Sequence, residues 1–246
     1  LEATGKGLEG GQAHRQIARS VGCAASTITR QAARLARHAI LLHAYALSVL
    51  GEVTEPVGYD HFETFAVSQY FPMAVGTAIG QDSRFVYSLD AAPHRRTGRM
   101  SPIQKQIRSE LELRHGRPPR DSYARAMSES LDLLLAITPQ DRPLDLVTDD
   151  HPQYGVAIAR HPARSRIRRT VHPNPKRGPK GSARSRAAIR RDQAMATLDH
   201  AHQFIRHSCS HHGRETLAFC RRHSALIGRL FLHVVWVNLI KLRVEN

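Results

Sequence analysis

The order of strand-like and helix-like patterns along the chain constrains its fold more than any other feature. Three runs rich in β-branched and aromatic residues come first, with a turn signal, Gly80-Gln81-Asp82, between the second and the third. A helical pattern follows, for which Asp121 is a suitable N-cap, and then a short apolar run that is typical of a buried strand. We expect strands within 59–89 and at 144–147, and helices at 121–136, 193–209 and 214–242. This order predicts an α/β fold in which helices flank a mixed sheet.

The first fifty residues differ from the rest because their pattern is helical and rich in alanine. Gly51, Pro56 and Gly58 then interrupt the pattern, which indicates a boundary. We therefore expect an all-α region at 1–50, followed by a larger α/β region at 51–246.

Residues 15–30 have the spacing of a helix-turn-helix. Ala18 is small where two helices must approach, Gly22 can adopt the left-handed conformation of a tight turn, and Ser26 is a suitable N-cap for the second helix. Side chains at the start of that helix would contact base edges and phosphates in the major groove. The alternative is a pair of alanine-rich helices that form a small bundle or a dimer contact. The DNA contacts predicted in this region are Thr27, Thr29, Arg30 and Arg34.

The positive charge of the chain is concentrated in one stretch. The sequence has 36 Lys and Arg against 21 Asp and Glu, a net charge of +15, yet no acidic residue lies between Asp150 and Asp192. Proline and glycine residues in the same stretch oppose a helix or a central strand, so we expect a basic arm at about 160–191. Such an arm is typical of a surface that follows DNA phosphates, and the alternative is a solvated linker. The arm residues assigned to DNA are Lys176, Arg177 and Lys180.

Other sequence features exclude several classes of protein. The most apolar segment, 225–242, is interrupted by four polar residues, so we expect no membrane span. We also expect no secretory leader, and the three cysteines lack a CxxC spacing, which favours a reducing compartment without disulfides or a zinc ribbon. The expected protein is cytoplasmic, and its excess positive charge favours nucleic acid as the partner, ahead of an anionic membrane.

Three aspartates have positions that suit an oxygen-rich metal site. Asp60 lies within a strand-like run, Asp149 directly follows the expected strand at 144–147, and Asp199 lies near the start of a helix. If the first strand is central and the later strand pairs beside it, two carboxylates emerge side by side, and a helix across the sheet can bring the third. Such a trio can hold two divalent cations that activate a nucleophile and stabilise the leaving oxygen of a phosphodiester. The alternative is that these aspartates act only as caps.

At these residues the sequence resembles a known family, the DDE/DDD transposases of small bacterial insertion sequences, which have a ribonuclease-H-like catalytic core. The segment 60–65, Asp-His-Phe-Glu-Thr-Phe, looks like the first acidic strand of the family. The segment 148–154 has the Thr-Asp pair of the second motif, with a tyrosine five residues after the aspartate. The segments 199–206 and 214–216 are similar to the closing helices, in which the third acid precedes an arginine by about two turns and an Arg-x-Thr sequence follows.

The resemblance implies a mechanism and a set of site residues. Asp60, Asp149 and Asp199 would be catalytic and would hold two Mg²⁺ or Mn²⁺ ions, which activate water and then a DNA 3′-hydroxyl for in-line attack. Because many relatives have glutamate as the third acid, Asp192 and Glu215 remain alternatives to Asp199. Arg206 and Arg214 would be further phosphate contacts, and the alternative is that each forms a surface salt bridge.

The resemblance also implies the partners. Double-stranded DNA would be bound at the element ends and at the target, by a homodimer associated with the bacterial nucleoid. The fold would be a ribonuclease-H-like mixed sheet preceded by the helix-turn-helix. A non-catalytic, sequence-specific DNA-binding regulator is the main alternative, and an RNA-binding protein suits the charge but not the motifs.

Overall fold

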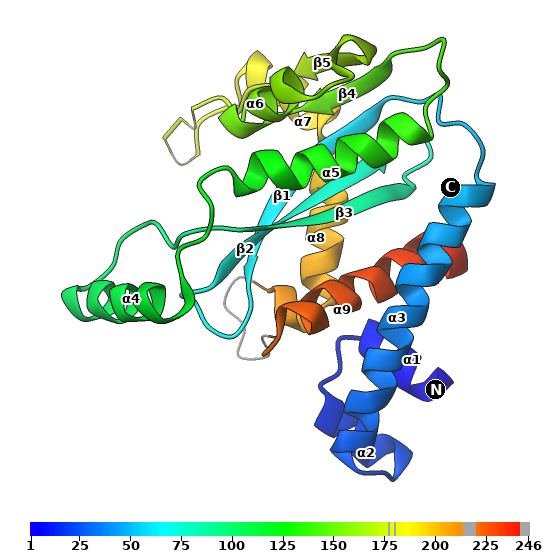
Figure 1. The fold of residues 1–246 in the computed structure, drawn as a ribbon, viewed down its shortest axis with the longest axis vertical. Helices are drawn as coiled ribbons and strands as arrows, with labels where there is room; N and C mark the ends of the chain where they lie inside the picture. The colour runs from blue at the N-terminus through cyan, green and yellow to red at the C-terminus, as the bar shows by residue number, and fades with distance from the viewer. Residues whose placement is uncertain (177, 180, 214–219, 242–246) are drawn as a thin grey trace.

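The computed structural model describes residues 1–176, 178–179, 181–213 and 220–241, and its centre is a five-stranded sheet with helices on both faces (Figure 1). The strands are β1 (Val57–Phe65), β2 (Pro72–Gly80), β3 (Val86–Pro93), β4 (Leu144–Thr148) and β5 (Ile167–Val171). The α-helices are α1 (Glu2–Glu9), α2 (His14–Val21), α3 (Ala25–Val49), α4 (Pro102–His115), α5 (Ser122–Ala136), α6 (Pro152–Arg160), α7 (Arg186–Ala194), α8 (Ala196–Ser208) and α9 (His223–Val235). Single turns at Arg164–Arg166, Ser210–His212 and Trp236–Ile240 complete the described elements. The predicted α/β class with a mixed sheet is confirmed.

The sheet has the strand order β3-β2-β1-β4-β5. Strands β1, β2 and β3 form the predicted antiparallel meander, joined by short connections. Strand β4 pairs parallel to β1, and β5 pairs parallel to β4. A parallel neighbour requires a long crossover, which the segment containing α4 and α5 provides between β3 and β4. Strand β1 is therefore the central strand and lies beside β4. This is the condition under which Asp60 and Asp149 were expected to lie close together.

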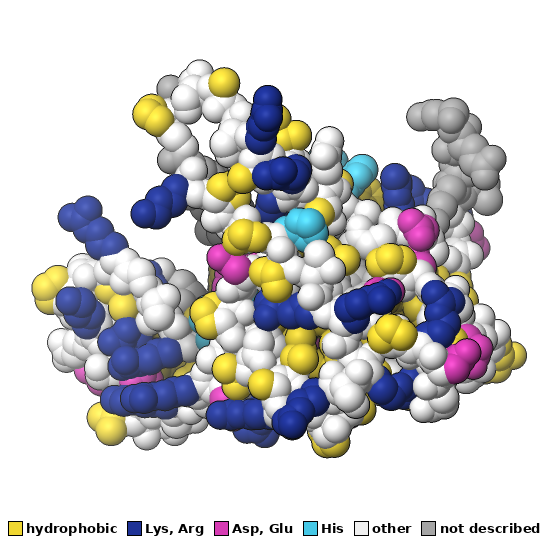
Figure 2. Space-filling view, turned by 90° about the horizontal axis from the view of Figure 1, so that it is seen from above, with side chains coloured by type: hydrophobic (Ala, Val, Ile, Leu, Met, Phe, Trp, Pro, Cys, Tyr) yellow, Lys and Arg dark blue, Asp and Glu magenta, His cyan; other side chains and the backbone are white. Residues whose placement is uncertain are grey.

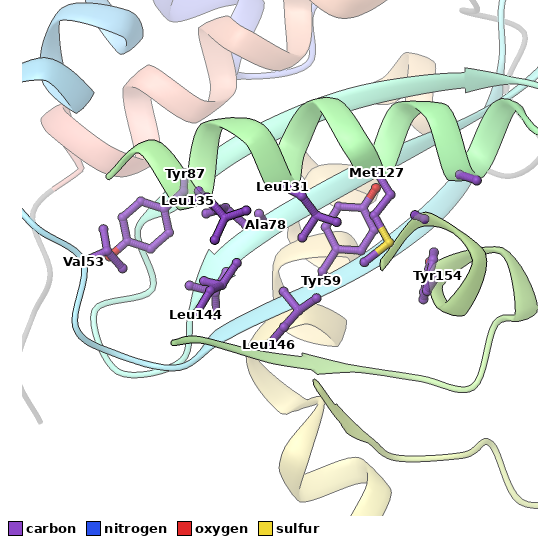
Figure 3. Close-up of a cluster of buried hydrophobic side chains, with 14 of the residues drawn as sticks. Val53, Tyr59, Ala78, Tyr87, Met127, Leu131, Leu135, Leu144, Leu146 and Tyr154 are labelled. Atoms are coloured by element: carbon purple, nitrogen blue, oxygen red, sulfur yellow. The ribbon is translucent and has the colours of Figure 1, made fainter. Parts of the chain in front are cut away.

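One face of the sheet is covered by α5 and α6, and the largest cluster of buried apolar residues lies there (Figure 3). Met127, Leu131 and Leu134 recur at helical spacing along α5 and are almost fully buried. They pack against Tyr59 of β1 and Leu146 of β4. The predicted helix at 121–136 is confirmed as α5, with Asp121 at its N-cap position, although the Asp121 side chain makes no capping hydrogen bond.

The opposite face is covered by α8 and α9. Leu198 and Ile205 of α8 are buried with residues of β1 and β2, together with Leu230 of α9. Gly58 lets α8 approach β1 closely, because a Cβ at position 58 would lie 2.8 Å from Cδ1 of Leu198. The close contact fixes which residues of α8 lie over β1.

The helical pair of the N-terminal region is confirmed. Helix α2 ends at Gly22, which has a left-handed backbone with φ of 72°, and Ala18 is buried where the helices meet. Ser26 is not the N-cap of the second helix, because α3 begins two residues earlier than predicted, with Ala24 at its N-cap. Helix α3 then continues to Val49, and its second half packs against α9 and the sheet, so the predicted boundary near residue 50 coincides with the end of one long helix.

The prediction that residues 160–191 form an irregular arm is wrong for much of that stretch. Strand β5 adds to the sheet edge within it, and α7 begins at Arg186. An edge strand tolerates charge because its exposed side chains point to solvent, and Arg168 of β5 pairs with Asp145 of β4. Helix α4 was also missed, although Ser101 and Gln104 form a capping box at its start.

The closing helix is shorter than predicted in the part of the chain that the structure describes. Helix α9 begins at His223 and continues as a π turn to Ile240, while residues 214–219 of the predicted helix lie outside the described residues. By length and composition, His223–Ile240 is the one described helix apolar enough to cross a membrane, and a third of it is buried inside the fold. We expected no membrane span because polar residues interrupt this segment. Those polar residues alone do not exclude a membrane span, since His223–Ile240 is long and apolar enough for one.

Candidate active site

The pairing of β1 with β4 brings two of the predicted aspartates together. Tyr59 of β1 lies opposite Thr148 of β4 in the parallel register, so the next residue of each chain segment is an aspartate. Asp60 continues along β1, while Asp149 is the first residue after β4. The Asp60 side chain is only 16% exposed. This neighbouring placement is the geometry that the sequence analysis predicted for the first two acids.

The electrostatics of Asp60 reflect that placement. Burial, followed by the negative charge of Asp149, raises the pKa of Asp60 to about 6. Hydrogen bonds donated to Oδ1 by the backbone N–H of His61, at 2.8 Å, and by the Tyr154 hydroxyl, at 3.2 Å, oppose part of this increase. Two carboxylates in this arrangement repel each other, and a proton or a bound cation would relieve the repulsion.

The basic stretch helps to position the second aspartate. Asn174 donates its side-chain N–H to Oδ2 of Asp149 at 3.0 Å, and the backbone N–H of His151 donates to Oδ1 at 2.9 Å. Arg169 of β5 donates to the Asp149 carbonyl and to the Thr148 hydroxyl, both at 2.8 Å. Part of the predicted DNA-binding arm therefore has a structural role beside the acids.

Asp199 has a different environment from the first two aspartates. Its carboxylate forms a two-pronged ion pair with the guanidinium of Arg191, which is only 14% exposed. The α8 residue that faces Asp60 is His202, one turn further along, whose Nδ1 lies 4.0 Å from Oδ2 of Asp60. Since positions three apart on a helix are neighbours, Asp199 lies beside this pair with its charge directed to Arg191.

His202 is an uncharged group in the site. It is 5% exposed, and burial, followed by the positive charge of Arg206, lowers its pKa to about 3. Its Nε2 is buried without a hydrogen-bond partner among the residues that the structure describes. His202 was not among the site residues predicted from the sequence, and its three-residue spacing from Asp199 was the signal that could have found it.

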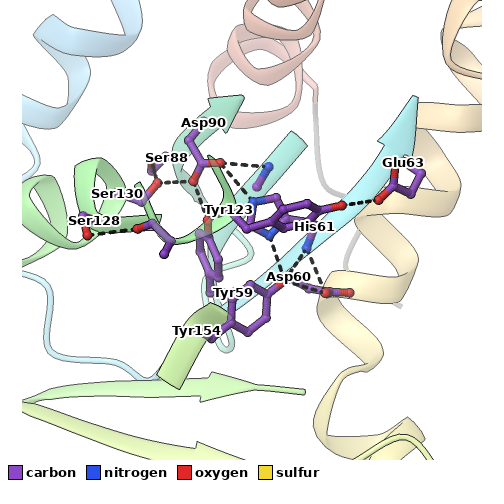
Figure 4. A network of polar contacts seen from close by, with 12 residues as sticks. Tyr59, Asp60, His61, Glu63, Ser88, Asp90, Tyr123, Ser128, Ser130 and Tyr154 are labelled. Carbon is purple, nitrogen blue, oxygen red and sulfur yellow. Dashed lines mark hydrogen bonds and ion pairs between the residues drawn. The ribbon is translucent and has the colours of Figure 1, made fainter. Parts of the chain in front are cut away.

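A chain of buried polar side chains extends from Asp60 into the fold (Figure 4). The Tyr154 hydroxyl lies 2.8 Å from Nδ1 of His61, and Nε2 of His61 lies 3.4 Å from Oδ1 of Asp90. Tyr59 donates its hydroxyl to Asp90 at 2.6 Å. His61 and Asp90 are each 3% exposed, so the chain is closed off from solvent. Tyr154 belongs to the segment that resembles the second transposase motif. Asp90 was not predicted as a member of this polar chain, and the signal that could have found it is the presence of an aspartate inside the mostly apolar strand β3.

The other candidates for the third acid are less well placed or are not described. Asp192 pairs with Arg184 and lies 3.8 Å from Arg191. Glu215 and Arg214 lie outside the described residues. Across the described ranges, no three His, Cys, Asp or Glu side chains form a group that could hold a metal ion. The trio with two metal ions therefore remains a prediction, of which the structure brings together two members.

The predicted DNA contacts are mostly exposed. On α3, Arg30 and Arg34 are exposed, Thr27 is half-buried, and Thr29 donates its hydroxyl to the backbone of its own helix. Arg206 of α8 lies with its guanidinium 5.7 Å from the centre of the Phe62 ring, on the sheet face. Lys176 is exposed, while Arg177 and Lys180 lie outside the described residues.

Comparison with protein-family models gives no match for this chain, and comparison with curated proteins gives none either. The resemblance to transposases therefore depends on the residues quoted from the sequence and on their geometry.

Proposed function

We propose that this protein is a metal-dependent DNA strand-cleaving and strand-joining enzyme, an insertion-sequence transposase of the DDE/DDD class with a ribonuclease-H-like core. The observation that supports this most is the neighbouring placement of Asp60, on β1, and Asp149, directly after the parallel strand β4. The strand order, an antiparallel meander followed by two parallel strands, agrees with the fold that the resemblance implies.

The acid pair fits a divalent cation by its chemistry. Two carboxylates, one of them buried and of raised pKa, provide the oxygen ligands that Mg²⁺ and Mn²⁺ prefer, and water or phosphate oxygens could complete the coordination. When bound, such an ion would polarise a phosphodiester and activate the attacking oxygen. The described residues provide two of the acids that a two-ion site requires, and Asp199, Asp192 and Glu215 remain the alternatives for the third.

The residues around the pair have orienting roles in this proposal. Tyr154 donates to Oδ1 of Asp60, which directs that oxygen toward the protein and leaves Oδ2 to act as ligand. Asn174 and the backbone of His151 orient Asp149 by donating to Oδ2 and Oδ1 respectively, so a cation would share these oxygens with the two donors through their remaining lone pairs. His202, which is uncharged, adds no positive charge that would compete with a cation.

Binding of double-stranded DNA is part of the same proposal. The net charge of +15 favours a polyanion, and the exposed Arg30 and Arg34 belong to the second helix of a helix-turn-helix arrangement. We further propose that the protein acts on bacterial DNA in the cytoplasm as a homodimer, because two element ends must be held together for joining.

The test is a nicking assay on supercoiled DNA with Mg²⁺ or Mn²⁺. Asp60→Asn and Asp149→Asn should each abolish cleavage and leave DNA binding nearly unchanged, because each removes one metal ligand. Asp141→Asn is the matched control, since Asp141 is exposed and lies in the loop before β4. Normal nicking by either of the first two variants would refute the site.

A non-catalytic DNA-binding regulator is the second candidate function. The ion pair between Asp199 and Arg191 favours it, because that pair leaves Asp199 without a free charge for a metal. A regulator would bind a defined DNA sequence but would leave supercoiled DNA intact at every concentration of divalent metal.

A further inference from the structure

A basic cavity of about 740 Å³ lies beside the acid pair. Its walls come from the ends of β1 and β2, the segment after β3, the segment between α4 and α5, and His151. His151 connects the cavity to the acids, because its backbone N–H donates to Oδ1 of Asp149 at 2.9 Å. A molecule in the cavity would therefore lie next to whatever the acid pair binds.

The cavity is positively charged. Four arginines and one glutamate, Glu63, are among the residues that line it. Arg95 and Arg117 both pair with Glu112, at 2.6 and 2.9 Å, so their charge is partly compensated. Figure 2 shows further Lys and Arg side chains gathered over the α4 projection beside this region. The charge of the cavity favours an anionic ligand.

Two of the lining arginines are not paired with a carboxylate among the residues that the structure describes. Within the described ranges, neither Arg96 nor Arg120 has an ion pair, and Nη1 of Arg96 is buried without a hydrogen-bond partner. Burying a guanidinium nitrogen without a partner is costly, and an anion in the cavity would offset that cost. Ser122 and Tyr123, the first residues of α5, also line the cavity, and the positive end of the helix dipole there favours negative charge.

The cavity also presents aromatic rings. His94, Tyr123 and His151 line it, and Arg96 also lies with its guanidinium 5.1 Å from the centre of the ring of Tyr70, which is not a lining residue. The rings of Tyr123 and His151 stack with their centres 4.8 Å apart and their planes 23° from parallel. Arginines that contact phosphates and flat rings that contact bases are the combination by which proteins bind single-stranded nucleic acid. A volume of 740 Å³ suits a small ligand or a short single strand and is too small for a duplex.

We propose that this cavity binds an unpaired segment of DNA strand that adjoins the phosphodiester held at Asp60 and Asp149. Arg96 and Arg120 contact its phosphates, and the stack of Tyr123 with His151 contacts a base. The inference rests on the proposed function, because it assigns the strand to the DNA substrate of that site.

The test measures binding of a fluorescein-labelled oligo(dT) by fluorescence anisotropy, with the full chain in EDTA so that no cleavage occurs. The variants are Arg96→Gln, Arg120→Gln and the double variant. The matched control is Arg142→Gln, which removes the same charge from an exposed position before β4, away from this cavity. Arg120 is exposed, so its replacement leaves the fold intact and keeps the test decisive even if the Arg96 variant unfolds.

We expect the double variant to bind oligo(dT) at least about tenfold more weakly. Each lost phosphate contact should also flatten the dependence of log affinity on log salt by about 0.7. The Arg142 control should bind as the unmodified protein does. Unchanged affinity of both the Arg120 and the double variant would overturn the proposal, and tighter binding of oligo(rU) than of oligo(dT) would overturn the assignment to DNA.

The two proposals fail in different ways. If the unmodified protein nicks supercoiled DNA with Mg²⁺ while the Arg96 and Arg120 variants bind oligo(dT) normally, only the cavity assignment is refuted. If the unmodified protein binds neither oligo(dT) nor duplex DNA, the proposed function itself is refuted.

Discussion

Replacing Asp60 by asparagine should make the metal-free protein more stable at neutral and alkaline pH. In the folded chain, burial and the neighbouring Asp149 raise the pKa of Asp60 to about 6, from an ordinary value of 3.8. The folded state therefore binds a proton more tightly than the unfolded state does. Above about pH 6, both states have lost that proton, and the folded state has the higher cost of holding the charge.

The size of this effect follows from the difference between the two pKa values. Each tenfold change in acidity corresponds to about 1.4 kcal/mol, so an increase from 3.8 to about 6 corresponds to about 3 kcal/mol. The loss of folding stability caused by the charged Asp60 grows as the pH rises from 3.8 to about 6. At pH 4 this loss is only about 0.5 kcal/mol. For a chain of this size, about 3 kcal/mol corresponds to an increase in Tm of roughly 6 to 12 °C.

Thermal unfolding in EDTA, followed by circular dichroism at pH 4 and at pH 8, measures this difference. The Tm of Asp60→Asn should exceed that of the unmodified protein at pH 8 and should approach it at pH 4. The exposed Asp141→Asn variant should show no such pH-dependent gain. A destabilised Asp60→Asn variant at pH 8, or a gain of equal size at both pH values, would refute the assignment of a strained carboxylate pair.

Three further predictions concern the surroundings of Asp60. Mn²⁺ should raise the Tm of the unmodified protein at pH 8, because a ligand of the folded state stabilises it, and the Asp60→Asn variant should show little increase in the same titration. Tyr154→Phe removes a hydroxyl that donates to the Asp60 carboxylate, so carboxyl NMR should report a higher pKa for Asp60, and urea unfolding should show a loss of about 1–3 kcal/mol. Gly58→Ala should cost about 1–3 kcal/mol in urea unfolding because its Cβ would contact Leu198, whereas Gly5→Ala, whose Cβ would have only an ordinary contact, should not destabilise the fold.

The central part of the fold could be predicted because its local patterns and its long-range pairing agree. Each predicted element in this part has a pattern of apolar residues that matches its buried surface. All of them appear in the structure: the three strand-like runs, the helix at 121–136 and the strand at 144–147. Asp60 and Asp149 could be predicted to lie side by side because Asp60 lies within one strand and Asp149 directly follows the strand that pairs with it. The pairing of the two strands therefore determines where both residues lie.

The basic stretch could not be predicted in the same way. Strand β5 has arginines at positions where an inner strand would have apolar residues, and only its place at the sheet edge makes that sequence compatible with a strand. The position of a strand within a sheet is a tertiary property, so no local pattern in the sequence reveals it.

The environment of Asp199 was beyond prediction for a related reason. The rotation of α8 about its axis decides whether Asp199 or His202 faces Asp60, and that rotation depends on tertiary packing of α8 on the sheet, which includes the buried Leu198 and Ile205. The competing ion pair depends on Arg191 of α7, a residue at the end of the stretch expected to be irregular.

Strand β5 also bears on how this protein behaves at high concentration. It is the outermost strand on its side of the sheet, and its outer backbone groups face away from β4. Arg168, which pairs with Asp145, and Arg169, which donates to Thr148 and Asp149, make this edge strand charged instead of apolar, and a charged edge strand is a poor template for pairing with a second molecule. Exchanging these cations for apolar side chains would remove a safeguard against fibril-like association, even where the folded molecule itself survived the change.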